Sequence, residues 1–249
     1  MIKGDMRKAA LLKTAEELFF TRGYAATTIN DILENQHCSK GSFYHHFESK
    51  LDVLTALCRA DAERAYERYT RDAAETEDPL DKLNLLLSAS FPVQEAEKNL
   101  CALLMQLIAT PEGEQVLSVL FGELRLRFFD DFCALTDELA RQERAFLPIP
   151  GIPALVFGAY QTECRQMLKI GADMAQGKDV PPQEAADSLR AIRYLMERTM
   201  DLPFATIRVA DATQADSLLR ACAAHARSVQ KEAPTAPAVG DHRQMSMLQ

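Results

Sequence analysis

The chain has 249 residues, of which 47% are hydrophobic and 26% charged, as expected for a globular protein with a packed core. It contains no apolar run long enough to span a bilayer and no secretory signal at its N-terminus, so we expect a cytoplasmic protein with no membrane partner. The formal net charge of −8 argues against a general polyanion binder.

The first predicted helix spans residues 7–21. Its apolar side chains recur at helical spacing and form a single stripe, made of Leu11, Leu12, Ala15, Leu18 and Phe19. Gly23 follows at the place where the end of a helix favours a residue with positive φ. The stripe predicts that one face of this helix is buried.

Two short helices joined by a brief turn are predicted next. Thr27 and Thr28 can each cap a helix that ends near Asn35, and Asp31 follows Thr28 by three residues in a capping-box-like arrangement. After a break at residues 36–38, Ser39 can cap a third helix. Two short helices separated by a turn of this length predict a helix-turn-helix motif.

The remaining segments also favour helices. Ser49 can cap a fourth helix, and prolines at the first helical position follow the caps Asp78 and Thr110. Further helices are expected at about 154–176, 182–201 and 210–230, with a loop at 148–153. Pro92 is expected to end or kink the helix that begins at Pro79. With no strand-like alternation and no repeat, the fold class predicted is all-α.

The segment from Ser39 to Lys50 carries most of the functional information. It is short and polar, and Phe43 and Phe47 could anchor it from behind while its other side chains face outward. An α-helix fits the major groove of DNA, and a positively charged helix N-terminus attracts phosphate. The candidate DNA contacts here are Ser39, Lys40, Gly41, Ser42, Tyr44, His45 and Lys50. From spacing alone, an ordinary helical hairpin with a solvated face is the alternative.

These residues resemble the DNA-binding domain of TetR-like transcriptional regulators over roughly residues 7–58. The resemblance is carried by Arg22-Gly23-Tyr24, Thr27-Thr28-Ile29, Asp31-Ile32, residues 39–47 and Ser49-Lys50. It adds Thr28 to the candidate DNA contacts. It implies a three-helix DNA-binding domain at residues 1–58, with the fourth helix as a link, and a larger helical domain for effector binding and dimerisation at residues 59–231. The tail, residues 232–249, is expected to be disordered.

The resemblance further implies a homodimer, a palindromic operator in double-stranded DNA, and a small-molecule effector that releases a repressor. The dimer would form through the helices at 154–176 and 182–201, where small residues would permit close packing. Those residues are Gly158, Ala159, Gly171, Ala172, Ala185 and Ala186. The helix at 210–230 is an addition to the common plan and must pack against the effector domain or across the dimer.

Candidate effector contacts rest on weaker grounds. Large apolar side chains of the second domain could line an effector pocket or could belong to the hydrophobic core. The candidates are Phe91, Met105, Phe121, Phe128 and Phe157. The sequence does not distinguish the two roles.

The turn departs from the family pattern. Gln36-His37 stands where relatives usually have small residues, often Ala-Gly, and glycine suits a left-handed backbone better than histidine does. A helical interaction module that kept the fold but lost or altered DNA binding is therefore the alternative function.

We expect no enzyme, cofactor or metal site. The chain has no nucleophile elbow, no H-E-x-x-H and no glycine-rich phosphate loop. His45 and His46 are adjacent on a helix and point about 100° apart, so they chelate poorly together. The six cysteines are scattered without a C-x-x-C pair, which predicts free thiols.

Overall fold

The computed structural model describes residues 3–108 and 110–232, and every regular element within these ranges is a helix. The predicted all-α class is therefore confirmed. The helices are α1 Lys3–Arg22, α2 Ile29–Asn35, α3 Lys40–Tyr44, α4 Lys50–Ala73, α5 Pro79–Ser90, the short 3₁₀ helix η1 Glu95–Glu97, α6 Lys98–Leu107, α7 Pro111–Arg141, α8 Ile152–Ala175, α9 Glu184–Thr199 and α10 Ala212–Glu232. The tail expected to be disordered lies outside the described residues apart from Glu232.

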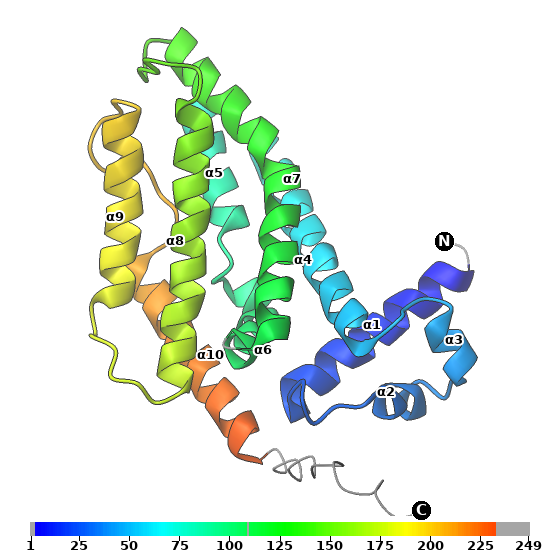
Figure 1. The fold of residues 1–249 in the computed structure, drawn as a ribbon. Helices are drawn as coiled ribbons and strands as arrows, with labels where there is room; N and C mark the ends of the chain where they lie inside the picture. The colour runs from blue at the N-terminus through cyan, green and yellow to red at the C-terminus, as the bar shows by residue number, and fades with distance from the viewer. Residues whose placement is uncertain (1–2, 109, 233–249) are drawn as a thin grey trace, which may run out of the picture.

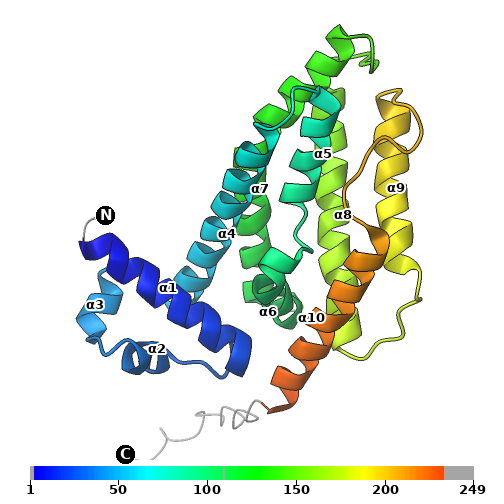
Figure 2. The same cartoon turned by 180° about the vertical axis from the view of Figure 1, so that it is seen from behind.

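The helices form a small N-terminal group and a larger bundle (Figure 1). Helices α1, α2 and α3 lie together at one end, and α4 runs from them into the bundle beside α7 (Figures 1 and 2). Tyr66 on α4 donates to the Asp131 carboxylate at 3.0 Å, and Arg127 on α7 donates to Glu63 at 2.9 Å. These contacts fix the linking helix α4 to α7.

Helix boundaries follow from caps that the sequence predicted. The Asp78 carboxylate accepts from the Leu80 backbone N–H at 2.7 Å, and the Thr110 hydroxyl accepts from the Gly113 N–H at 3.1 Å. In both helices a proline occupies the first turn, where its missing N–H leaves no bond unmade. Helix α5 ends at Ser90, before Pro92, as expected. Helix α6, which follows, had no counterpart among the predicted helices.

Several small residues expected at a dimer surface instead pack inside the protomer. A Cβ on Gly171 would lie 2.2 Å from the Met105 side chain on α6, so this glycine permits α8 to approach α6 closely. Ala172 and Ala185 are also buried within the chain. Their assignment to the dimer interface was therefore wrong, because helical period alone does not say which partner a small face meets.

All six cysteines are free thiols, four of them buried. None of the described helices combines the length and apolar character that a membrane crossing requires.

Candidate nucleic-acid interface

Helix α3 is held by aromatic side chains on its inner face. Phe43 and Phe47 are buried, with ring centroids 5.6 Å apart, and they belong to the same core as Ile32 of α2. The Ser39 hydroxyl caps the helix by accepting from the Ser42 N–H at 3.3 Å. The inner face is thus fixed by packing, which leaves the outer face free to contact a ligand.

The outer face carries most of the predicted DNA contacts. Tyr44 is 56% exposed, although its size and apolar ring would favour burial in the absence of a partner. Ser42 and Lys50 are only half-buried, whereas the other predicted contacts are exposed, namely Thr28, Ser39, Lys40, Gly41, Tyr44 and His45. The fold therefore gathers six of the eight on accessible surface at or next to the helix-turn-helix.

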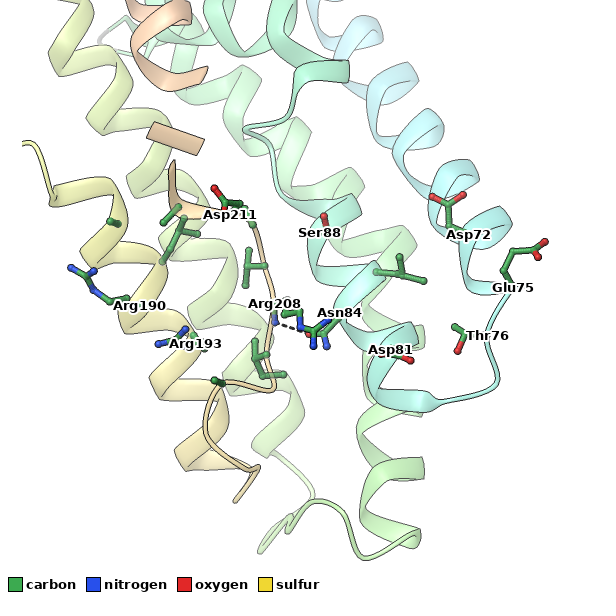
Figure 3. A pocket seen from close by; sticks show the side chains of 18 residues that line it. Asp72, Glu75, Thr76, Asp81, Asn84, Ser88, Arg190, Arg193, Arg208 and Asp211 are labelled. Atoms are coloured by element: carbon green, nitrogen blue, oxygen red, sulfur yellow. Dashed lines mark hydrogen bonds between the residues drawn. The ribbon is translucent and has the colours of Figure 1, made fainter. Parts of the chain in front are cut away.

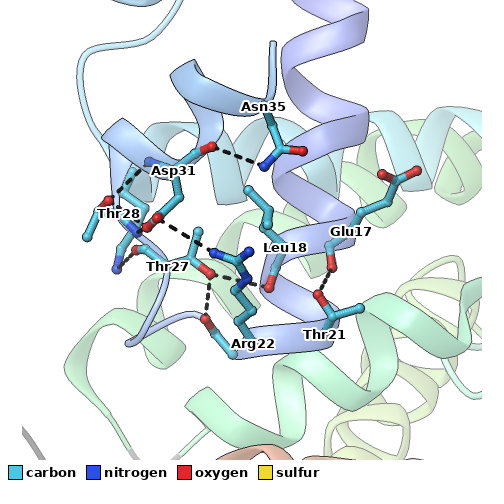
Figure 4. A network of polar contacts seen from close by, with 10 residues as sticks. Glu17, Leu18, Thr21, Arg22, Thr27, Thr28, Asp31 and Asn35 are labelled. Atoms are coloured by element: carbon cyan, nitrogen blue, oxygen red, sulfur yellow. Dashed lines mark hydrogen bonds and ion pairs between the residues drawn. The ribbon is translucent and has the colours of Figure 1, made fainter. Parts of the chain in front are cut away.

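Helix α2 begins in a capping box that also fixes Thr28 (Figure 4). The Asp31 carboxylate accepts from the Thr28 N–H and hydroxyl, both at 2.6 Å, while the Asp31 N–H donates to the Thr28 hydroxyl at 3.1 Å. These hydrogen bonds, with a smaller contribution from Arg22 at 3.6 Å, lower the pKa of Asp31. Thr28 is thus held rigidly at the N-terminus of α2, where backbone N–H groups favour an anion.

The Lys50 side chain makes hydrogen bonds within the N-terminal group of helices. Its ammonium donates to the backbone carbonyls of Tyr24 at 2.7 Å and Thr27 at 2.9 Å, and it lies 4.2 Å from the centre of the Tyr24 ring. In this arrangement the charge closes the loop between α1 and α2. Its predicted contact with phosphate stays a prediction, and in this arrangement two of the three ammonium N–H groups are already used by these carbonyls.

The turn between α2 and α3 is a Schellman motif with histidine in the place usual for glycine. The Cys38 N–H donates to the Leu33 carbonyl at 3.1 Å, and the His37 N–H donates to the Glu34 carbonyl at 3.2 Å. His37 has φ of 46°, so it adopts the left-handed backbone that suits the glycine usual at this position. Gln36 also stabilises the turn, because its amide donates to the Thr14 hydroxyl on α1 at 2.6 Å. The unusual turn therefore keeps a regular helix-turn-helix geometry.

Two contributors to this domain carried little signal in the sequence. Tyr24 supplies both a carbonyl and a ring face to Lys50, and α10 reaches back from the other end of the chain to contact α1. The stacking of His225 on Phe20, with ring centroids 3.9 Å apart, joins residues 205 positions apart. A contact over such a distance in sequence leaves no local pattern.

The side chains considered for an effector pocket pack in the core. All five are buried, namely Phe91, Met105, Phe121, Phe128 and Phe157. Phe91 borders a small cavity together with Tyr160 and Cys164, while a much larger groove opens between α5 and α9. Burial raises the pKa of Tyr160, whose hydroxyl donates to the Leu87 carbonyl at 2.7 Å. Within the described residues, no group of three or more His, Cys, Asp and Glu is placed to hold a metal.

Sequence comparison finds relatives of the N-terminal part of the chain. Residues 11–57 match the family model described as bacterial regulatory proteins, tetR family. Over 91 residues the chain is 37% identical to the HTH-type transcriptional repressor KstR2 of Mycobacterium tuberculosis. The aligned segment covers 36% of this chain and 46% of the repressor. The chain thus spans less than half the length of this curated relative.

Solved structures share the fold along most of the chain. A TetR-family transcriptional regulator from Pectobacterium atrosepticum superposes with a TM-score of 0.54 at 20% identity, covering 81% of this chain and 97% of that one. A protein from Saccharomonospora viridis described as a transcriptional regulator, solved in complex with choline, gives a TM-score of 0.55 at 15% identity, covering 79% and 98%. Residues 11–57 thus match the helix-turn-helix of tetR-family regulatory proteins, and the chain shares its overall fold with these solved structures.

Proposed function

We propose that the protein is a transcriptional repressor that binds a palindromic operator as a homodimer and releases it when a small-molecule effector binds. The observation that carries this proposal is the outer face of α3, where Lys40, Tyr44 and His45 are exposed on a helix anchored by Phe43 and Phe47. A helix supported in this way can enter the major groove without losing its own packing. Relatives of the N-terminal part are named as transcriptional regulators and repressors.

The homodimer is supported by apolar side chains exposed on α8 and α9. Leu155 on α8 is 68% exposed and Leu195 on α9 is 40% exposed. Gly158, one turn after Leu155, has open space around the position of a Cβ, so a neighbouring helix could approach there. A symmetric pair of such faces would bury these side chains in a four-helix interface. The two-fold axis would set two α3 helices to read half-sites one turn of DNA apart, about 34 Å.

Repression would end when an effector binds better to a conformation that does not fit DNA. By linkage, the factor by which the effector weakens operator affinity equals the factor by which the operator weakens effector affinity. The family fold places α4 between the two parts of the chain, so a shift of α4 could change the separation of the two α3 helices.

Selection of bound sequences from random double-stranded DNA tests the proposal directly. The full chain should enrich a palindromic sequence, and Tyr44→Ala should weaken binding to that sequence about tenfold or more, since a base or phosphate contact is worth about 1–3 kcal/mol. Lys40→Ala should also make the slope of log affinity against log salt concentration shallower by about one, because one phosphate contact is lost. Lys82→Ala, on the distant helix α5, should change neither the affinity nor this slope.

The alternative, an interaction module with altered DNA binding, makes the opposite prediction for this selection. Failure to enrich any sequence would favour it over the repressor, while unchanged affinity in both the Tyr44 and Lys40 variants would refute the assignment of α3 as the recognition helix.

A further inference from the structure

A wide groove lies between α5, α9 and the segment that connects α9 to α10 (Figure 3). Its volume of about 830 Å³ is within the range of small-molecule sites. Apolar side chains line it from three elements, with Leu85 from α5, Leu189 from α9, and Ile207 and Val209 from the connecting segment. An apolar ligand body of moderate size could therefore lie along it.

Three arginines line the same groove. Arg190, which is paired with Asp187, and Arg193 come from α9, and Arg208 comes from the connecting segment. Within the described part of the chain the Nε of Arg193 is buried without a hydrogen-bond partner, and the guanidinium lies 5.2 Å from the centre of the Phe204 ring. Arginine presents its N–H groups in a planar fork that matches the oxygens of a carboxylate or phosphate. This side of the groove is therefore suited to an acidic group.

The opposite side of the groove is acidic. Asp72, Glu75 and Asp81 line it from the end of α4, the following turn and the start of α5. Asp72 is paired with Arg71 at 3.0 Å, and Asp81 lies in the first turn of α5, where the helix terminus stabilises a carboxylate. A second anionic group would be repelled here. Asp211 of the connecting segment also lines the groove, but its carboxylate accepts from the Gln214 N–H at 2.9 Å. The charges thus favour a ligand with a single acidic end, directed at the arginines.

The segment over this groove, residues 205–211, is tied to its surroundings by specific bonds, and we name it the strap. The Asn84 side chain of α5 donates to the Thr206 carbonyl at 2.9 Å and accepts from the Arg208 N–H at 2.7 Å. On the other side, the buried carboxylate of Glu197 accepts from the Ile207 N–H at 3.0 Å. The position of the strap is therefore fixed by the two helices that form the groove walls.

The strap leads directly into α10, whose far end contacts α1 of the helix-turn-helix domain. The His225 Nε2 is 2.8 Å from the Phe20 carbonyl, and the two rings are stacked. A Cβ on Gly23 would lie 2.8 Å from the Val229 side chain, so α10 packs closely against the end of α1. A displacement of the strap would consequently be transmitted along α10 to the domain that carries α3.

We propose that this groove is the effector site, that its ligand is a small molecule with one acidic group on an apolar body, and that binding acts on the DNA-binding domain through the strap and α10. The effect on DNA rests on the proposed repressor function. The binding site rests on the groove alone, so the two can fail separately.

Calorimetric titration with decanoate, a simple acid with an apolar chain, tests the site in the full-length protein without DNA. Decanoate should bind, and decan-1-ol and decylamine, with the same chain, should bind at least about tenfold more weakly. The double variant Arg190→Gln, Arg193→Gln should lose about tenfold or more of the decanoate affinity, because charge-assisted hydrogen bonds are removed. Arg198→Gln is the matched control, since Arg198 is an exposed arginine of α9 that does not line the groove.

Absence of decanoate binding, equal affinity for the three probes, or an affinity unaffected by the double variant would overturn the assignment of the site. Decanoate binding that persists in a protein that selects no DNA would support the site and refute the repressor function.

The route through α10 is tested with the selected operator. Decanoate should weaken operator binding by the wild-type protein, and His225→Ala should reduce that effect while leaving decanoate affinity unchanged. His225→Phe, which keeps an aromatic ring against Phe20 but removes the hydrogen bond, guards against simple unfolding of the alanine variant. An undiminished effect of decanoate in both variants would overturn the route.

Discussion

The Lys50 ammonium donates to the Tyr24 carbonyl at 2.7 Å and lies 4.2 Å from the centre of the Tyr24 ring. A lysine expected to contact phosphate therefore has a structural role in this conformation. It satisfies two carbonyls of the α1–α2 loop with a charged donor, and the ring face adds a cation–π attraction.

Replacing Lys50 with methionine should lower the free energy of unfolding by about 2 kcal/mol, because the apolar stem remains while hydrogen bonds from a charged group are lost. Urea denaturation measures the change. Lys82→Met is the control, since Lys82 meets an exposed Glu77 at 3.8 Å and such pairs contribute little. Equal stability of the Lys50 variant and the wild type would mean that the ammonium is not held by these carbonyls in solution.

The left-handed backbone at His37 leads to a second prediction. A non-glycine residue with φ of 46° is strained by about 1 kcal/mol, whereas glycine adopts this conformation freely. His37→Gly should therefore raise the free energy of unfolding by up to about 0.6 kcal/mol after the greater flexibility of the unfolded chain is allowed for. The Schellman hydrogen bonds are kept, so operator affinity should change little.

Two comparison variants test the cause of that gain. His37→Val should destabilise the protein, because a β-branched side chain tolerates positive φ poorly. His45→Gly should also destabilise it, since His45 has φ of −69° and gains nothing from glycine. A His37→Gly protein less stable than the wild type would show that the histidine side chain contributes more than the strain removes.

The N-terminal elements were predictable because their signals are local. Thr28 with Asp31 and Ser39 with Ser42 are cap pairs within four residues, and the structure confirms both. The left-handed backbone at His37, in contrast, was suggested only by the glycine that relatives often have at this position. Helix–turn boundaries of this kind depend on backbone groups that neighbouring side chains must satisfy, so they can be read from adjacent residues.

The partners of side chains were less predictable. Lys50 has the right spacing for a phosphate contact, but its bonds to Tyr24 and Thr27 depend on how the α1–α2 loop folds back. Gly171 and its neighbours share one helix face, but the sequence does not say whether that face meets α6 or a second chain. The groove likewise unites residues 72–88, from α4, α5 and the turn between them, with residues 186–212, from α9, the strap and the start of α10, which follow at least 98 positions later.

A buried carboxyl on α4 predicts a pH-dependent stability. Burial, and next the nearby Glu97 carboxylate, raise the pKa of Asp61 to about 7, although Arg64 at 2.9 Å opposes the rise. Because the folded pKa exceeds the unfolded value, Asp61 favours folding at low pH, and this contribution is lost as pH rises from about 4 to about 7. The full change is at most about 4 kcal/mol, at about 1.4 kcal/mol per pKa unit.

Unfolding free energies at pH 5, 6, 7 and 8 test this for wild type and Asp61→Asn. The asparagine variant keeps the size of the side chain without the ionisation, so its stability should fall less across this range than that of the wild type. Arg68 and Glu97 form the neighbouring ion pair and stay unchanged in both proteins. Parallel pH profiles would show that Asp61 does not titrate in this window.

The proposed dimer yields the last prediction. Leu155 and Leu195 are exposed on α8 and α9, and burial of a leucine side chain contributes about 1.5–3 kcal/mol. Because each side chain occurs twice in a symmetric interface, Leu155→Asp with Leu195→Asp should convert the dimer to monomer in light scattering coupled to size exclusion. Leu126→Asp, on α7, alters a leucine that is 75% exposed and should leave the dimer intact. A double variant that remains dimeric would place the interface on another surface.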